Sequence, residues 1–211
     1  MKSTFALVIA TLFAFISAHT TKYFASCPKY ESNMSFERFN QTAFGGLWFE
    51  YLYDGDFKEN SKYECASWNL LSHSEGQYYL LHNSQNRSTG LYAMVQHKMT
   101  CGKPYTPESQ TCNLKTQDSP TVIHDYTLTR PRNLQIIDTD MYSYAVMSAC
   151  YDYGAAHQED FVVITRTKEP SMMTKKSILN ALSKTLGMSD EKITSLEKGN
   201  VRDCWGEDHH L

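Results

Sequence analysis

The stretch GGLWFEYLYDG, residues 45–55, puts an aromatic side chain at nearly every second position after a pair of glycines. Successive side chains of a β-strand point to opposite faces, so residues 46–53 are predicted to form a strand with Trp48 and Glu50 on one face. That face also carries Leu52, and the other face carries Phe49, Tyr51 and Tyr53.

Seven further segments have the composition of strands and follow one another at short, even spacing. No helical periodicity interrupts them, which excludes βαβ units. Eight strands joined mostly by short turns predict an all-β fold, an eight-stranded antiparallel up-and-down barrel, because closure leaves no free strand edge. Residues 83–90 are predicted to form the turn of a hairpin, and residues 100–112 a longer loop. The predicted strands are residues 46–53, 62–72, 77–83, 91–99, 121–129, 133–140, 142–151 and 160–168.

The segment from residue 171 to residue 187 has the pattern of an amphipathic α-helix. Its apolar side chains recur every four residues, so we expect the helix to pack on the outside of the barrel. Ser189 is predicted to cap a second, short helix that stops at Gly199. The apolar positions of the first helix are Ile178, Leu182 and Leu186, with Leu179 beside them.

The first 18 residues have the pattern of a secretory signal peptide: Lys2, an apolar run over residues 5–16, and a cleavage site after Ala18. A membrane anchor is the alternative, but a bilayer span needs about 20 apolar residues. The sequence therefore predicts a secreted, extracellular protein in which residues 19–211 form a single domain. Three sequons, at Asn33, Asn40 and Asn86, fit glycosylation of an exported chain.

The even number of cysteines, 6 in all, also fits export and suggests a set of disulfides. Zinc binding is the alternative, but no pair of cysteines has the close spacing typical of a zinc site. The residues alone leave the pairing open. The cysteines are Cys27, Cys65, Cys101, Cys112, Cys150 and Cys204.

Charge and composition limit the partners. The net charge is −3 and no basic patch dominates, so nucleic acid is not an expected partner. Aromatic residues make up 13% of the chain, which argues against disorder. No metal site is predicted, because the acidic and histidine-rich residues 207–210 have the character of a solvated tail.

Three motifs together resemble those of the lipocalin family. Gly46 and Trp48 match its G-x-W signature, Thr139 and Asp140 match the T-D-Y motif, and Arg166 matches the arginine that ends the last strand. Their order and spacing agree with the family, as does the helix after the barrel. The cysteine layout is similar to the branch that holds apolipoprotein D, insect bilin-binding proteins and crustacyanins.

The resemblance implies that Trp48 closes one end of the barrel with Arg166 over its ring, so both are structural residues. One position departs from the family pattern: Met141 stands where the T-D-Y motif has tyrosine, and Tyr142 follows it. This departure leaves the packing of that turn open.

The resemblance also implies two disulfides that fasten both ends of the chain to the barrel. The two remaining cysteines are not part of the family's usual set and are expected to close the loop between them. The implied pairs are Cys27–Cys150 and Cys65–Cys204, which leaves Cys101–Cys112.

An eight-stranded barrel is just wide enough to enclose one small ligand. The resemblance implies a carrier that holds a pigment such as a bilin or carotenoid, or a lipid or fatty acid, without a covalent bond. For a generic barrel, the alternative is a solid core. His82, His97 and His124 are in predicted strands and could hydrogen-bond a polar group of the ligand. The residues expected to line the ligand site are Glu50, Trp68, Leu70, Leu134, Ile136, Ala145, Met147, Val162 and Ile164.

Two other functions compete with carriage. An enzyme is not expected, because every cysteine has a plausible disulfide partner and no thiol nucleophile remains. The alternative is a surface-acting protein whose role is oligomeric assembly or partner binding, with Phe49, Tyr51 and Tyr53 as interface residues. A homo-oligomer is compatible with both functions, and no membrane span is expected.

Overall fold

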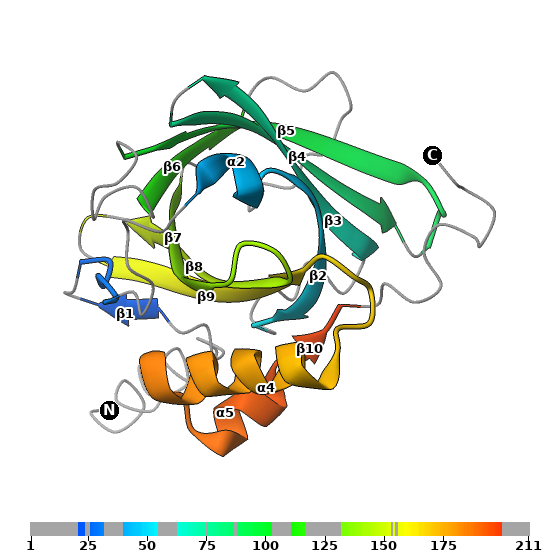
Figure 1. The fold of residues 1–211 in the computed structure, drawn as a ribbon. Helices are drawn as coiled ribbons and strands as arrows, with labels where there is room; N and C mark the ends of the chain where they lie inside the picture. Colours follow the sequence, from blue (N-terminus) through cyan, green and yellow to red (C-terminus); the bar gives the residue numbers. More distant parts are fainter. Residues whose placement is uncertain are drawn as a thin grey trace, which may run out of the picture.

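The computed structural model describes residues 21–23, 26–31, 40–54, 63–74, 76–86, 88–102, 111–116, 132–152, 154 and 156–199. Within them, strands β2 to β9 form a closed antiparallel barrel: each strand pairs with the next, and β9 pairs with β2 (Figure 1). The predicted fold class, an eight-stranded up-and-down barrel with a C-terminal helix outside, is confirmed. The strands are β2 (Gly46–Tyr53), β3 (Tyr63–Ser74), β4 (Gln77–Asn86), β5 (Tyr92–Cys101), β6 (Thr111–Thr116), β7 (Arg132–Thr139), β8 (Tyr144–Asp152) and β9 (Ala156–Thr165).

The fifth barrel strand, β6, begins inside the segment predicted to be a loop. Cys101 at the end of β5 pairs with Cys112 in β6, and Cys112 and Leu114 are buried while Asn113 between them is exposed. This alternation is that of a short strand with one buried face. The segment predicted as the fifth strand, residues 121–129, lies outside the described residues.

A β-bulge at Tyr51 corrects the predicted faces of β2. The pairing of β2 with β9 shifts there by one residue, and such a shift reverses the alternation of the residues that follow. Leu52 therefore pairs with Val163 on the outer face instead of pointing inward, and Tyr53 pairs with Val162 instead of taking the outer face. Both predictions were wrong because a strict period of two cannot foresee an inserted residue.

Two short strands extend the sheet beside the barrel. Strand β1 (Thr21–Tyr23) pairs with the beginning of β9, and β10 (Glu197–Lys198) pairs with the end of β2. A short helix, α2 (Gln41–Phe44), lies across one end of the ring of strands (Figure 1). Strands β1 and β10 therefore pair with β9 and β2, the two strands whose pairing closes the barrel.

The helical segment after the barrel is α4 (Met172–Asn180) followed without a break by one π-helical stretch, η4 (Ala181–Thr185). Ser171 caps it, because its hydroxyl accepts a hydrogen bond from the Thr174 backbone N–H at 3.1 Å. Ile178 and Leu182 are buried as predicted, whereas Leu179 is 49% exposed and does not share their face. Among the described residues, no helix is long and apolar enough to cross a membrane.

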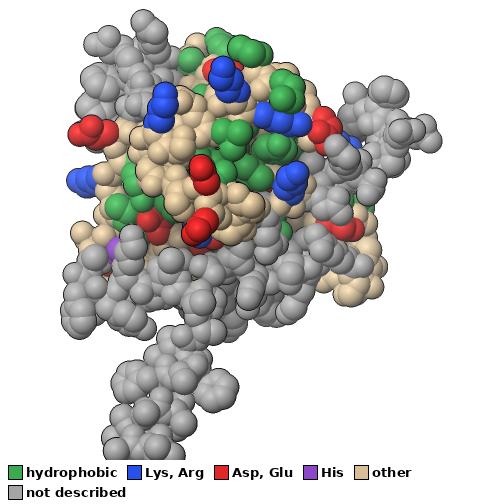
Figure 2. Space-filling view, turned by 90° about the horizontal axis from the view of Figure 1, so that it is seen from below, with side chains coloured by type: hydrophobic (Ala, Val, Ile, Leu, Met, Phe, Trp, Pro, Cys, Tyr) green, Lys and Arg blue, Asp and Glu red, His purple; other side chains and the backbone are tan. Residues whose placement is uncertain are grey.

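An outer cluster of buried side chains joins these helices to the barrel. Figure 2 views the face that carries the helices, where hydrophobic side chains lie between basic and acidic side chains. A second helix, α5 (Asp190–Ser195), is capped by Ser189 and ends before β10, so Gly199 does not stop it as predicted. Lys192 of α5 pairs with Asp54 at 2.7 Å. The outer cluster consists of Leu52, Tyr144, Val146, Val163, Ile178, Ala181, Leu182 and Leu196.

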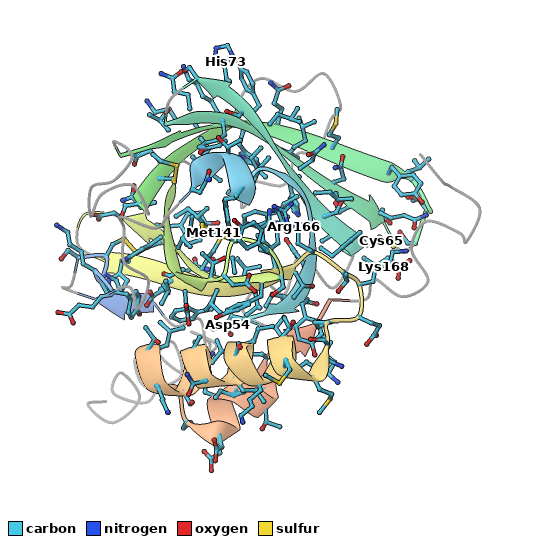
Figure 3. The ribbon with its side chains drawn as sticks, in the orientation of Figure 1. Asp54, Cys65, His73, Met141, Arg166 and Lys168 are labelled. Carbon is cyan, nitrogen blue, oxygen red and sulfur yellow. A yellow bond between two sulfur atoms is a disulfide. The ribbon has the colours of Figure 1, made fainter. Side chains whose placement is uncertain are left out.

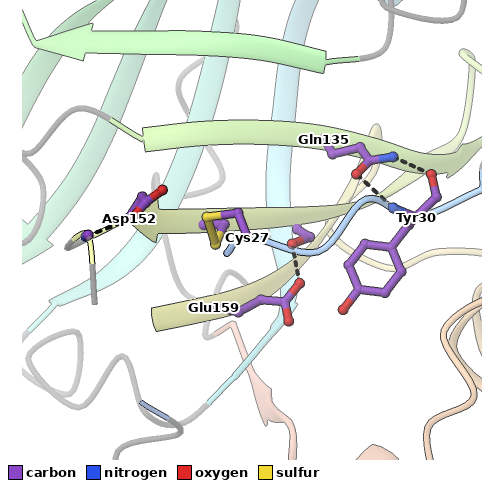
Figure 4. The surroundings of a disulfide bond; sticks show 8 residues. Cys27, Tyr30, Gln135, Asp152 and Glu159 are labelled. Carbon is purple, nitrogen blue, oxygen red and sulfur yellow. Dashed lines mark hydrogen bonds between the residues drawn. A yellow bond between two sulfur atoms is a disulfide. The ribbon is translucent and has the colours of Figure 1, made fainter. Parts of the chain in front are cut away.

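The segment before the barrel is fastened across its outer wall (Figure 4). A disulfide joins Cys27 to Cys150, the pair that the resemblance implies. Gln135 then holds the backbone of Tyr30 twice: its oxygen accepts from the Tyr30 N–H at 3.1 Å, and its amide donates to the Tyr30 carbonyl at 2.5 Å. Burial and a hydrogen bond to Glu159 raise the pKa of the Tyr30 hydroxyl.

The other three cysteines among the described residues are also in disulfides. Cys101 bonds Cys112 across β5 and β6. Cys65 is disulfide-bonded as well, and its implied partner Cys204 lies outside the described residues. Also outside them are the predicted signal peptide, the sequon at Asn33, His124 and the tail at residues 207–210.

Candidate ligand-binding site

One end of the barrel is closed by α2 and the Trp48 side chain. Trp48 is fully buried, and its ring N–H donates to the Phe44 carbonyl at 2.9 Å, with the two rings 5.1 Å apart. Gly46 has a φ of +94°, and a Cβ there would lie 3.1 Å from the Arg166 side chain. Glycine is therefore required at this point of the turn into β2.

Arg166 covers this closed end. Its guanidinium lies over the Trp48 ring, 3.7 Å from the ring centroid. The same group donates to the backbone carbonyls of Ala43, Gly45 and Leu47 at 2.8, 2.6 and 2.9 Å. Arg166 thus ties α2 and the start of β2 to the end of β9.

The turn between β7 and β8 completes the plug. The Asp140 carboxylate accepts hydrogen bonds from the backbone N–H groups of Tyr142, Ser143 and Tyr144 and from the Ser143 hydroxyl. Burial alone would raise the pKa of Asp140, but these hydrogen bonds lower it below its usual value. The turn therefore stabilises the ionised form of this carboxyl.

Met141, the residue that departs from the family pattern, has a defined place in this turn. Its φ is 68°, a left-handed conformation, and its N–H donates to the Thr139 hydroxyl at 2.8 Å. Its sulfur accepts the Asn40 N–H at 3.0 Å, so the turn is joined to the N-cap of α2. Figure 3 shows Met141 and Arg166 beside α2 at the closed end.

Apolar side chains from all eight barrel strands line the interior. Every predicted lining residue except Glu50 belongs to this interior cluster, and Glu50 points to the same side. Whether they hold a ligand stays a prediction. The interior cluster consists of Phe44, Trp48, Trp68, Leu70, Tyr78, Leu80, Met99, Cys112, Leu114, Leu134, Ile136, Ala145, Met147, Ala149, Val162 and Ile164.

The predicted set omitted β4, β5 and β6, which contribute Leu80, Met99 and Leu114. The alternation that marks an inward-facing row of side chains is present in β4, where every second residue from Tyr78 is buried. His82 continues that row, since it pairs with Trp68 of β3. Counting alternate residues through the β4–β5 hairpin would have found Leu80 and Met99, but not Leu114, because β6 was not predicted as a strand.

A polar group of three side chains, the Glu50 cluster, lies within this apolar interior. Trp68 donates its ring N–H to Glu50 Oε1 at 2.5 Å, and His82 Nε2 lies 3.2 Å from the same oxygen. The rings of Trp68 and His82 meet edge to face at 5.9 Å. All three residues are at most 6% exposed, so the carboxylate is shielded from solvent.

A closed eight-stranded barrel with one plugged end and an apolar interior defines the class of up-and-down β-barrel folds. No protein-family model and no curated protein sequence matches this chain. Solved structures do match it. Insecticyanin from the tobacco hornworm Manduca sexta has a TM-score of 0.65 at 14% sequence identity, over 86% of this chain and 89% of its own.

Two further structures agree in fold. Lobster apocrustacyanin A1 has a TM-score of 0.61 at 14% identity, over 83% of this chain and 88% of its own. A biogenic amine-binding protein has a TM-score of 0.61 at 18% identity, over 82% of this chain and 86% of its own. At these identities the likeness establishes architecture, and this protein has the lipocalin fold.

Proposed function

We propose that the protein is a secreted carrier that binds one small hydrophobic ligand inside its barrel. The observation that carries the proposal is the Glu50 cluster. Burying a carboxylate is costly, and an interior that served only as packing would be filled with apolar side chains. Polar groups placed inside an apolar lining are instead the usual composition of a small-molecule site.

The ligand class follows from the lining. Aromatic and branched apolar side chains suit a pigment such as a bilin or carotenoid, or a lipid or fatty acid, held without a covalent bond. The biogenic amine-binding protein of the same fold supports small organic amines as a further class. The residues proposed to contact the ligand are Glu50, Trp68, Leu70, Leu134, Ile136, Ala145, Met147, Val162 and Ile164.

Native mass spectrometry and an absorption spectrum of protein from its own source test this function. A mass excess with visible bands indicates a pigment, and a mass excess without them a lipid or another colourless ligand. Absence of a mass excess, together with failure to bind any apolar fluorescent probe, contradicts carriage.

A substitution locates the site. Ala145 is completely buried in the interior, so Ala145→Leu is expected to weaken probe binding at least about tenfold by filling ligand space. Thr100→Leu adds a similar side chain at an exposed position of β5 and is the matched control. Equal affinities in both variants would place the ligand outside the barrel.

Secretion also predicts a glycan at Asn86. Its side-chain oxygen accepts from the N–H and the hydroxyl of Ser88 at 2.9 and 2.7 Å, at the turn that ends β4. In the Asn40 sequon, the corresponding oxygen caps α2 by accepting from Thr42 and Ala43. Peptide mapping of the secreted protein before and after enzymatic deglycosylation is expected to find Asn86 occupied.

The alternative of assembly through aromatic side chains has less support. Tyr53 is buried, and Phe49 and Tyr51 are only partly exposed, so the predicted interface residues do not form an exposed aromatic surface. Sizing chromatography with and without ligand tests this alternative, because an assembly protein would form a larger species in at least one state.

A further inference from the structure

We propose that the outer wall formed by strands β2 to β6 is a surface that docks on an anionic lipid bilayer. The inference goes beyond the proposed function, because it concerns the outside of the barrel and does not depend on a ligand inside it. This docking surface consists of Leu47, Leu71, Tyr79, Leu81, Met94, Lys98 and Lys115.

The strand register places four of these side chains in one row across the sheet. Leu71 of β3 pairs with Tyr79 of β4, which in turn pairs with Lys98 of β5. Lys98 then pairs with Lys115 of β6. Side chains of directly paired residues lie on the same face, and this face is the outer one because Leu71 and both lysines are exposed. The row therefore runs from an aliphatic side chain through an aromatic one to two cations.

Further aliphatic side chains widen this row into an apolar stripe. Leu47 of β2 lies diagonally across from Leu71, since it pairs with the residue two positions before it. Leu81 follows Tyr79 on the same face of β4, and Met94 of β5 lies diagonally across from Leu81. Leu47, Leu71 and Met94 are 46, 44 and 44% exposed. Single exposed leucines are common on proteins, but a contiguous apolar stripe marks an interaction surface.

The charges within the docking surface are all positive. Lys98 and Lys115 lie directly opposite each other, and like charges in that position destabilise a sheet. Neither lysine forms an ion pair with a described residue. Along the described outward positions of these strands, the first carboxylate is that of Glu64, which pairs with Gln85 at the other end of β4. The surface therefore combines apolar area with positive charge that an anionic partner would compensate.

The helices leave this surface uncovered. The His73 ring packs against Tyr79 at the edge of the docking surface, with the ring centroids 5.1 Å apart. Figure 3 shows His73 on the side of the barrel opposite α4 and α5.

An anionic bilayer fits both the apolar stripe and the lysine pair. Aliphatic side chains enter the interface of a bilayer, tyrosine lies at the level of the headgroups, and lysines are attracted to anionic headgroups. A second copy of this chain fits less well. A two-fold contact would place the docking surface against itself and would bring no carboxylate to the lysines.

Co-sedimentation of the mature full-length protein with sucrose-loaded vesicles tests the proposal. One set of vesicles is phosphatidylcholine alone, and the other is phosphatidylcholine and phosphatidylserine at about three to one. We expect at least about tenfold tighter binding to the anionic vesicles at about 0.15 M salt, and loss of most of this difference at about 1 M salt, where charges are screened. Equal binding to both sets, or binding to neither, overturns the proposal.

Two double variants test the two parts of the docking surface. Lys98→Gln with Lys115→Gln is expected to weaken binding to the anionic vesicles at least about tenfold, since each lysine near such a surface raises the affinity about fivefold. Leu71→Ser with Met94→Ser is expected to weaken it at least about fivefold, because side chains that enter the interface are lost. If the second variant binds as the wild type does, charge alone attracts the protein and the docking surface is not what seats it.

The helices provide matched controls on the opposite side of the barrel. Lys176→Gln with Lys184→Gln removes two exposed lysines from α4 and η4. Met172→Ser with Met173→Ser removes apolar side chains that are 79 and 75% exposed. Both controls should bind the anionic vesicles as the wild type does. A loss equal to that of the docking-surface variants would place the contact on the helices and overturn the proposal.

Two further measurements keep this inference separate from the proposed function. Urea denaturation shows whether each variant is folded. Binding of an apolar fluorescent probe inside the barrel should be the same in all four variants as in the wild type. A protein that binds the probe but not the vesicles overturns only the docking proposal, and one that binds the vesicles but no probe overturns only carriage.

Discussion

The Arg166 guanidinium lies 3.7 Å from the centroid of the Trp48 ring, although the two residues are 118 positions apart in the chain. One side chain thus provides a cation–π contact and three hydrogen bonds to backbone carbonyls. The plug at the closed end is a product of long-range packing between the first and last barrel strands.

Arg166→Ala is expected to lower the free energy of unfolding by about 2–4 kcal/mol, because the ring contact and the carbonyl partners are lost together. Urea denaturation measures this change. Lys176→Ala removes an exposed cation from α4 and should change the free energy by less than about 0.5 kcal/mol. Equal effects of the two substitutions would contradict the structural role of Arg166.

Asp140 should make stability depend on pH in the acidic range. Its pKa is lower in the folded protein than the usual value of 3.8, so its ionised form contributes stability above that value. The contribution is lost as the pH falls through the folded-state pKa. Asp140→Asn is expected to cost about 1 kcal/mol at neutral pH, allowing for solvent screening of this exposed group.

The difference between wild type and Asp140→Asn should then shrink as the pH is lowered below about 3.8. Denaturation curves at a series of pH values check this dependence. A difference that stays constant across the range would show that the carboxylate charge is not what stabilises the turn.

Gly199 has no room for a side chain. A Cβ there would lie 2.0 Å from the Glu50 carbonyl oxygen, which is backbone and cannot move aside easily. Gly199→Ala is therefore expected to displace β10 and to lower the free energy of unfolding by about 3 kcal/mol. Gly187→Ala is the comparison: it has open space but a φ of +62°, so about 1 kcal/mol is expected.

The two described disulfides should differ in their contribution to stability. Cys27 and Cys150 are separated by 123 residues, whereas Cys101 and Cys112 are separated by 11. In the chain-entropy model the longer loop contributes about 2 kcal/mol more. Unfolding of the two double serine variants measures this difference, and a larger loss in the Cys101→Ser, Cys112→Ser protein would contradict it.

Much of the fold could be predicted because alternation, turn residues and the three motifs are local signals. The strand at residues 46–53 has the bounds that GLWFEYLY indicates. Two features were not accessible in this way. The bulge at Tyr51 depends on the register with β9, and β6 is a short strand that only its pairing with β5 and β7 defines.

The candidate site was foreseen in part. Glu50 and Trp68 were expected on the inner wall. Their hydrogen bond could not be predicted, because it depends on the register between β2 and β3, which neither strand's own sequence gives. Of the three strand histidines that the sequence offered, His82 and His97 are both buried, and His124 lies outside the described residues. His97 lies in the buried row of β5 that also carries Met99, but the contact of His82 with Glu50 depends on the pairing between strands, which residue type alone does not give.

The positions of β1 and β10 affect how the protein behaves toward other copies of itself. At the beginning of β9, the neighbouring strand β2 no longer pairs with it, and β1 pairs with the backbone of β9 there. At the end of β2, the neighbouring strand β3 no longer pairs with it, and β10 pairs with the backbone of β2 there. Unsatisfied strand backbone is a template for chain-to-chain association. β1 and β10 therefore cover these strand edges, and a variant that lacks either strand is expected to associate more readily with other chains.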